Sequence, residues 1–194
     1  ADKQVDRLLY RDPTTGKVAH NDDEMDFYRK QKRVALRNCG FINPESIHEY
    51  IARKGYQALA QILEEKSPQE VIQEVKTSGL RGRGGGGFPT GLKWEMSAKS
   101  QSDIKYVVCN ADEGDPGAFM DRSILEGDPH SILEAMAICG YATGANHGLI
   151  YIRAEYPLAI KRLNIAIESA RALGLLGDKI LDSNFSFDVE IKLG

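Results

Sequence analysis

Residues 185–193 read FSFDVEIKL and carry the clearest strand pattern in the chain. Apolar side chains occupy every second position, which is typical of a strand with one buried face: Phe185, Phe187, Val189, Ile191 and Leu193. Short apolar runs at residues 104–109 and 149–153 predict two more strands. Helical patterns over residues 130–143 and 157–173 separate the three. Strands that alternate with helices in this way predict a parallel sheet with right-handed crossovers.

The predicted fold class is therefore α/β, with a parallel Rossmann-like sheet that has helices on both faces. We assign this domain to residues 79–194, and a mostly helical segment, residues 1–78, precedes it. Ser67 and Pro68 have the residue types of an N-cap and a first helical position. The remaining helices are expected, in chain order, at residues 22–37, 44–53, 56–64, 68–78 and about 90–98, with a single turn near Arg122 in a loop over residues 110–129.

The chain is expected to be an N-terminal fragment. It starts at Ala1 rather than at an initiator methionine, without an apolar signal sequence, and Gly194 ends an apolar run. The α/β domain is therefore expected to be truncated at its C-terminus.

Charge and cysteine content narrow the class of protein. The chain has 25 basic and 28 acidic residues, so its net charge is 25 − 28 = −3, which disfavours a nucleic-acid-binding protein. No apolar stretch reaches the roughly 20 residues that a membrane span needs, so no direct membrane insertion is expected. Cys39, Cys109 and Cys139 form no CxxC pair, which predicts no metal site here and a reducing, cytoplasmic location.

A glycine loop lies ahead of the first predicted strand. Seven of the 19 glycines fall between Gly79 and Gly91. Successive backbone amides followed by a helix N-terminus form a site for an anion, usually a phosphate, which Lys93 is placed to reach. A flexible hinge is the alternative. The match to the Rossmann fingerprint is weak because no strand precedes the loop, and Phe88 stands where a Walker motif needs lysine.

Acidic and amide side chains follow the first predicted strand. Asn110, Asp112, Glu113 and Asp115 come at its carboxyl end, where open α/β sheets bind their ligands. The amide of Asn110 can pair with the edge of a heterocycle, and carboxylates can accept hydrogen bonds from ribose hydroxyls or ring N–H groups. A solvated acidic turn and a cation site are the alternatives.

Two long motifs identify a family. Residues 79–94 read GLRGRGGGGFPTGLKW, and residues 110–113 read NADE. Residues 79–194 resemble the flavin-containing NADH-binding subunit of respiratory complex I. Three shorter blocks fit the same pattern, at residues 121–122, 128–130 and 151–156. Residues 7–78 resemble the related subunits of soluble NAD-linked hydrogenases and formate dehydrogenases.

The resemblance implies an oxidoreductase subunit in which NADH passes a hydride to FMN, and FMN passes electrons singly to iron–sulfur clusters. It implies partner subunits in a multi-subunit redox complex. A [4Fe–4S] cluster belongs to a four-cysteine motif of the parent protein that is absent here. No residue is expected to act as a catalytic acid or base. The residues expected at FMN are Gly82, Gly84, Lys93, Asn110, Asp112 and Glu113, and those expected at NADH are Phe88, Glu113 and Asp115.

Asp115 stands where the respiratory subunits usually have glutamate, and Met96 stands where an aromatic residue is common. Because aspartate is shorter than glutamate, the contact of Asp115 with the NADH ribose is expected to differ, which bears on the choice between NADH and NADPH. Methionine at position 96 bears on one stacking contact that an aromatic ring would make. Which complex the parent serves, whether this chain alone binds FMN, and its oligomeric state stay open.

Simpler roles are expected elsewhere. We interpret Cys109 and Cys139 as small buried hydrophobic residues, Trp94 as a packing residue and His130 as a local hydrogen-bonding residue.

Two alternatives to the flavoprotein interpretation remain. In one, residues 1–78 are a non-catalytic docking module that binds partner subunits; in the other, the glycine loop belongs to an unrelated phosphate-binding enzyme.

Overall fold

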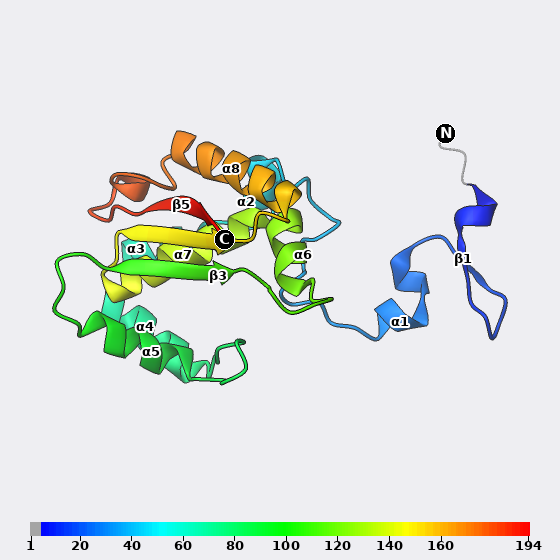
Figure 1. The fold of residues 1–194 in the computed structure, drawn as a ribbon, viewed down its shortest axis with the longest axis horizontal. Helices are drawn as coiled ribbons and strands as arrows, with labels where there is room; N and C mark the ends of the chain where they lie inside the picture. Colours follow the sequence, from blue (N-terminus) through cyan, green and yellow to red (C-terminus); the bar gives the residue numbers. More distant parts are fainter. Residues whose placement is uncertain (1–4) are drawn as a thin grey trace. The chain divides into compact units, whose positions relative to one another are not determined.

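The computed structural model describes residues 5–194. The chain divides between Arg37 and Asn38 into two units, and each is described by itself (Figure 1). The predicted division between residues 78 and 79 lies inside the second unit. Helices of residues 47–77 pack there against the long helix of residues 129–143.

The first unit has little regular structure. Strands β1 (Tyr10–Arg11) and β2 (Val18–Ala19) form an antiparallel hairpin. The helix predicted over residues 22–37 is present only as a 3-10 turn, Asp22–Glu24, and α1, Asp26–Arg29. Ala19 is the one buried apolar residue among those described in this unit. A helix that packs no apolar face against the rest of the protein is marginal in water. The described residues of the first unit provide almost no such packing, which explains why the predicted helix over residues 22–37 is reduced to these two short pieces.

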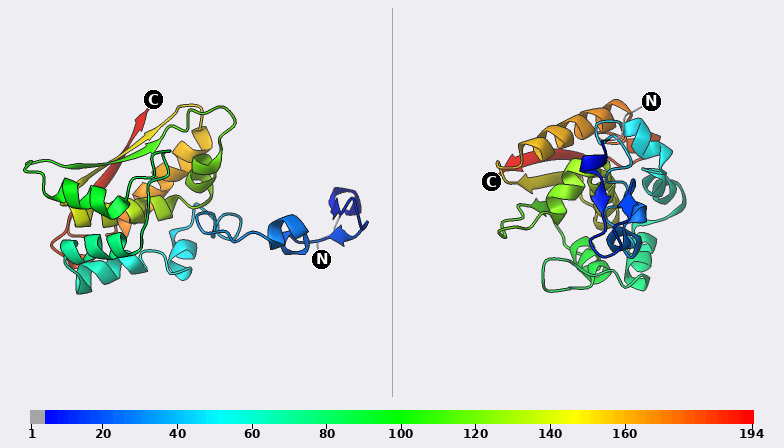
Figure 2. Two further views of the ribbon diagram at one scale, coloured as in Figure 1. Left: turned by 90° about the horizontal axis from the view of Figure 1, so that it is seen from below. Right: turned by 90° about the vertical axis from the view of Figure 1, so that its right-hand side faces the viewer.

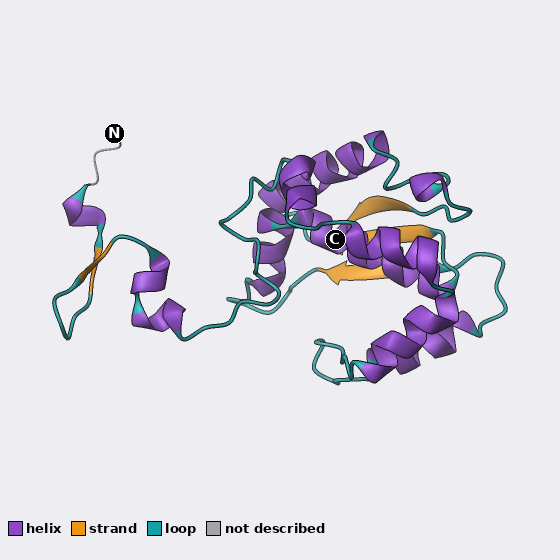
Figure 3. Cartoon of the chain, turned by 180° about the vertical axis from the view of Figure 1, so that it is seen from behind, coloured by secondary structure: helices purple, strands orange, loops and turns teal. Residues whose placement is uncertain are grey.

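The second unit contains most of the regular structure. Its helices are α2 (Ile47–Ala52), α3 (Gln57–Glu65), α4 (Pro68–Thr77), α5 (Thr90–Ala98), α6 (Met120–Gly127), α7 (Pro129–Thr143) and α8 (Pro157–Ala172). Its strands are β3 (Tyr106–Ala111), β4 (His147–Ile152) and β5 (Asp188–Leu193), and a 3-10 turn spans Ile180–Asp182. Figure 3 shows these helices and strands in separate colours. None of the helices among the described residues is long and apolar enough to cross a membrane.

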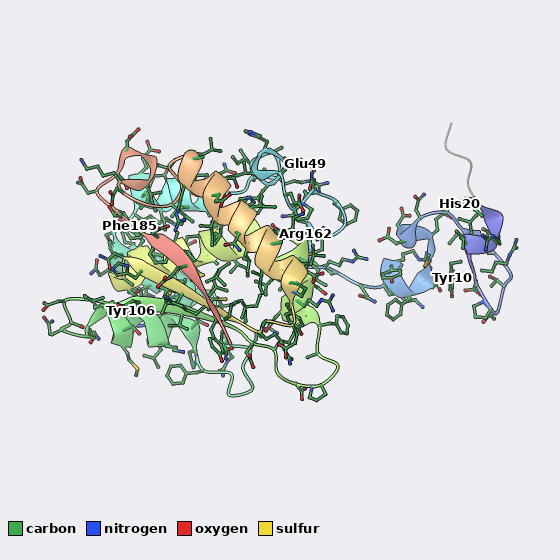
Figure 4. All side chains as sticks on the ribbon, turned by 45° about the horizontal axis from the view of Figure 1, so that its top comes forward. Tyr10, His20, Glu49, Tyr106, Arg162 and Phe185 are labelled. Carbon is green, nitrogen blue, oxygen red and sulfur yellow. The ribbon has the colours of Figure 1, made fainter. Side chains whose placement is uncertain are left out.

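The three strands form a parallel sheet in the order β3-β4-β5. The predicted α/β class and parallel sheet are confirmed. β5 begins later than predicted: Phe187 pairs with Gly177 across an isolated bridge instead of joining the strand, although its ring is buried in the core. Figure 4 labels Phe185 in the segment ahead of β5.

The helices of the second unit lie on one face of the sheet, as Figure 2 shows. The expectation of helices on both faces differs from this arrangement. The strand order runs in one direction, so two right-handed crossovers place their helices on the same side. Buried or half-buried residues alternate with more exposed ones along each strand. The side chains on the uncovered face include Tyr106, Val108, Asn110, Tyr151, Glu190 and Lys192.

Local signals set several helix boundaries. Ser67 and Glu70 form a reciprocal capping box at the start of α4, as the Ser67–Pro68 pattern suggested.

Trp94 is half-buried against the core, which supports its interpretation as a packing residue. α4 and α5 approach so closely that a Cβ on Gly91 would lie 2.6 Å from the Lys76 backbone nitrogen. Glycine at this position therefore lets the glycine loop lead into a helix that lies directly against α4.

A buried polar network joins α7 to α2 and α3. The Glu134 carboxylate accepts hydrogen bonds from the Tyr50 hydroxyl (2.6 Å), the Tyr56 amide (2.9 Å) and the Leu59 amide (3.3 Å). His130 lies one helical turn earlier, with Nδ1 2.9 Å from the Tyr56 hydroxyl. His130 therefore forms a hydrogen bond, as predicted, but the prediction of a local role is wrong because its partner lies 74 positions away in the chain.

Candidate functional site

The glycine loop is closed at its base. Arg81 pairs with Pro89 in an antiparallel bridge. The Gly82 amide donates to the Phe88 carbonyl at 2.9 Å, and the Arg81 guanidinium donates to the Gly87 carbonyl at 3.0 Å. These contacts hold the two ends of the loop together. They argue against a flexible hinge, because a hinge needs no bonded base.

The tip of the loop presents backbone amides to solvent. Gly85 has φ +91°, a conformation that favours glycine. Within residues 5–194, the amides of residues 84–86 donate no hydrogen bond to another protein atom. No atom lies within 4 Å of an added Cβ at Gly84, Gly85 or Gly86. The tip therefore offers several N–H donors and open space next to them, which suits an anion.

Helix α5 begins directly after this loop. Lys93 lies in its first turn with an exposed side chain, and Phe88, just before the helix, is 48% exposed.

Burial raises the pKa of the Cys139 thiol to about 11, and the charge of Lys93 acts in the opposite direction. Burial likewise raises the pKa of Cys109 to about 11. Both side chains are half-buried rather than fully buried as predicted, and their raised pKa values disfavour the reactive thiolate.

The acidic loop follows β3. The Asn110 side-chain oxygen accepts a hydrogen bond from the Asp112 amide at 3.2 Å, and the Asp115 side chain is exposed. Glu113 is held differently, because its carboxylate accepts from the amides of Asp121 (2.8 Å) and Arg122 (3.0 Å). Glu113 thus caps α6, which has eight residues where a single turn was predicted.

The carboxyl end of β4 completes this edge of the sheet. The Tyr156 hydroxyl donates to Glu113 Oε2 at 3.2 Å, and the Arg153 guanidinium donates to the Glu113 carbonyl at 3.2 Å. Burial and the bond to Glu113 raise the pKa of Tyr156. Burial and the charge of Glu113 raise the pKa of Asp121. Tyr156 and Arg153 were not predicted as site residues, although both belong to the motif block at residues 151–156.

The predicted residues fall into two groups. Gly82, Gly84, Phe88 and Lys93 belong to the loop before α5 and to its first turn. Asn110, Asp112, Glu113 and Asp115 belong to the end of β3 and the loop after it. In Figure 1 both segments lie toward the end of the sheet to which β3 points. Among the described residues, no hydrogen bond or ion pair joins the two groups, and no cluster of three or more His, Cys, Asp or Glu side chains could hold a metal ion.

Residues 75–194 match the model of the Nuo51 FMN-binding domain. The chain belongs to this family. The resemblance to the complex I subunit is thereby confirmed, and the matched region contains every residue predicted for the site. The roles of those individual residues stay predictions.

Several curated proteins are similar to this member of the Nuo51 family. The chain is 63% identical over 166 residues to the NADP-reducing hydrogenase subunit HndC of Solidesulfovibrio fructosivorans, covering 86% of this chain and 34% of that protein. It is 48% identical over 161 residues to an NADH-quinone oxidoreductase subunit of Rhizobium meliloti, covering 83% and 38%. The chain thus spans about a third of the length of these relatives.

A solved structure shares the fold. The structure of an NAD⁺-reducing [NiFe]-hydrogenase in the air-oxidized state matches with a TM-score of 0.62 at 29% identity, covering 84% of this chain and 25% of the hydrogenase chain. The two relatives and the solved structure are named as oxidoreductases or as subunits of them.

Proposed function

We propose that this chain supplies part of the FMN- and NADH-binding site of a multi-subunit oxidoreductase. In this proposal NADH reduces FMN, and partner subunits receive the electrons. The observation that carries the proposal is the Nuo51 FMN-binding match over residues 75–194, which includes both the glycine loop and the acidic loop. The relatives divide over the nucleotide, because the quinone oxidoreductase subunits are named for NADH and the hydrogenase subunit is named for NADP, so the choice between NADH and NADPH stays open.

The residues present fit an FMN phosphate and ring. The amides of residues 84–86 are free to donate, and Lys93 adds a cation at the start of α5. Asn110 and Asp112 supply amide and carboxylate groups at the end of β3. FMN, when bound, provides the chemistry that converts a two-electron donor into single electrons. The protein residues provide binding and orientation.

Titration of FMN into the chain, followed by flavin fluorescence, tests this proposal. We expect saturable quenching, and we expect Lys93→Ala to raise the Kd by at least about tenfold, because one charge-assisted hydrogen bond contributes roughly 1.5–3 kcal/mol. Lys99→Ala is the matched control, since this exposed lysine lies just after the other end of α5, and its Kd should stay within about twofold. A full-length protein and a chain that both leave the fluorescence unchanged would contradict the proposal.

We also propose that residues 1–37 dock a partner subunit. The first unit leaves Leu8, Phe27 and Val34 at least 67% exposed, and units of this size are rarely stable unless something covers their apolar surface. Only residues 1–37 should be deleted in the test, since α2 to α4 belong to the core of the second unit.

Deletion of residues 1–37 is expected to weaken capture of the partner subunits in a pull-down by at least about tenfold, while thermal unfolding of residues 38–194 stays unchanged. A milder variant, Phe27→Ser, should weaken capture in the same direction. Capture that is equal with and without residues 1–37 would reject docking by this unit.

A reducing, cytoplasmic location is proposed for the same protein. Within residues 5–194 the three cysteines form no disulfide, and reduced thiols are usual where glutathione and thioredoxin keep proteins reduced.

A further inference from the structure

We propose that Tyr156 and Arg153 are positioning residues of the candidate flavin site, which hold Glu113 and thereby fix the loop that presents Asn110 and Asp112. This inference rests on the proposed function and adds residues to that site. It also gives Glu113 a second role, as the anchor of the loop, beside its predicted contact with FMN or NADH.

The sheet register brings these residues together. Parallel pairing places Ala111 of β3 opposite Ile152 of β4. The chain therefore leaves both strands at the same edge, and Glu113 emerges next to Arg153 and Tyr156. Arg153 lies directly after β4, and Tyr156 directly precedes the first residue of α8. Because each residue adjoins the end of a regular element, the two can hold the loop in one place.

Glu113 has a backbone conformation that needs support. Its φ is +45°, which is uncommon for a residue other than glycine and costs on the order of 1 kcal/mol or more. The Arg153 guanidinium bonds the Glu113 carbonyl, and the Glu113 carboxylate bonds two amides of α6 and the Tyr156 hydroxyl. These contacts compensate for the strained conformation.

Most of the acceptor sites of the Glu113 carboxylate are used within the protein. It already accepts three hydrogen bonds, from Asp121, Arg122 and Tyr156. An ionised carboxylate has about four acceptor sites, so one site stays open on Oε1, which accepts only from the Asp121 amide, and a ligand can use it without removing the cap of α6. Among the described residues, the side chains of Asn110 and Asp112 take part, by contrast, in a single hydrogen bond, which the Asp112 amide donates to the Asn110 side-chain oxygen, so the Asp112 carboxylate and the Asn110 side-chain NH₂ are available to a ligand.

The Tyr156 ring is itself held in place. The guanidinium carbons of Arg122 and Arg153 lie 5.4 and 5.5 Å from its centroid, within the range of a cation–π contact. The residue is only 9% exposed. Tyr156 therefore links α6, the end of β4 and the acidic loop, and its hydroxyl is fixed in direction before any ligand arrives.

Amide hydrogen exchange and FMN titration test the proposal together. Tyr156→Phe removes one hydroxyl and keeps the ring. In the absence of FMN, we expect it to speed exchange of the Asp121 and Arg122 amides about tenfold, and in the titration to raise the FMN Kd several-fold. Glu113→Gln should have the same two effects. The double variant should lose no more FMN affinity than the weaker-binding of the two single variants, because both changes disrupt the same Tyr156–Glu113 hydrogen bond.

Tyr141→Phe is the matched control. It also removes a half-buried tyrosine hydroxyl, which donates to the Lys66 carbonyl at 2.6 Å far from the acidic loop in the chain. This variant should lower the thermal stability as much as Tyr156→Phe, yet leave both exchange rates and the FMN Kd unchanged. The comparison separates positioning from a general loss of stability.

Unchanged exchange at Asp121 and Arg122 in Tyr156→Phe would overturn the proposal. So would faster exchange with an unchanged FMN Kd, or additive losses in the double variant. If neither the wild-type chain nor the full-length protein binds FMN, the proposed function fails, and the exchange rates alone then decide whether Tyr156 anchors the loop.

Discussion

Replacing Glu134 with leucine is expected to lower the free energy of unfolding by about 3–5 kcal/mol, the cost of leaving buried donors without a partner. The carboxylate accepts from the Tyr50 hydroxyl and from the Tyr56 and Leu59 amides, and Glu134 is only 7% exposed. Two of these donors are backbone groups next to the start of α3, so the loss would also loosen the contact between α3 and α7. Urea denaturation followed by circular dichroism measures it.

Two further variants make this result specific. Glu134→Gln keeps one accepting oxygen, so we expect about half of the loss. Glu168→Leu makes the same change at an exposed position of α8 and should alter the free energy of unfolding by less than about 0.5 kcal/mol. A Glu134→Leu protein as stable as Glu168→Leu would show that the network contributes nothing to the fold.

Elements with local signals were predictable from sequence. The Ser67–Pro68–Glu70 pattern contains its own cap, and α4 begins at Pro68. The apolar periodicity of residues 130–143 and 157–173 predicted α7 and α8 to within one residue at each end. Alternating strands and helices sufficed for the parallel sheet, because handedness leaves few other topologies.

Features that depend on distant partners were not predictable in the same way. Glu134 interrupts an apolar helix, and nothing near it in sequence announces donors at Tyr50 and Tyr56, 84 and 78 positions away. The length of α6 depends on its cap by Glu113, which lies outside the helix. Helices on both faces would require the strand order to reverse, and the order of strands cannot be read from their periodicity.

The same distinction applies to the candidate site, where the continuous motifs were predictable from sequence and the contacts between distant residues were not. The glycine loop and the residues after β3 are continuous motifs, and the sequence alone singled them out. Tyr156 and Arg153 contact Glu113 only because β3 and β4 are neighbours in register. Predicting that contact requires the pairing of residues about 40 positions apart, which no single motif contains.

The stability of the second unit is expected to fall by about 3 kcal/mol between pH 6.5 and pH 4 because of His130 alone. Burial lowers the pKa of His130 from 6.5 to about 4, and the residue is only 1% exposed. In the unfolded chain, the His130 imidazole takes up a proton as the pH falls through 6.5. In the folded protein, the same imidazole stays neutral until the pH reaches about 4. The unfolded state binds more protons across this window, so acid favours unfolding.

The difference between wild type and His130→Asn isolates this contribution. Four titratable groups lie around the imidazole: Tyr50 and Tyr56, whose rings contact it, and Asp128 and Glu134 on the same helix or at its N-terminus. They are present in both proteins, so their own titration largely cancels in the difference. Urea unfolding at half-unit steps from pH 7 to pH 4 measures the two curves.

We expect wild type to lose its stability advantage over His130→Asn as the pH falls, by up to about 3 kcal/mol at pH 4. Tyr56→Phe keeps the imidazole and removes the hydroxyl bonded to Nδ1, so it should be less stable at every pH yet retain the wild-type slope. Parallel curves for wild type and His130→Asn would mean that the folded protein accommodates the charged imidazole, and that burial of His130 does not set the acid limit of the fold.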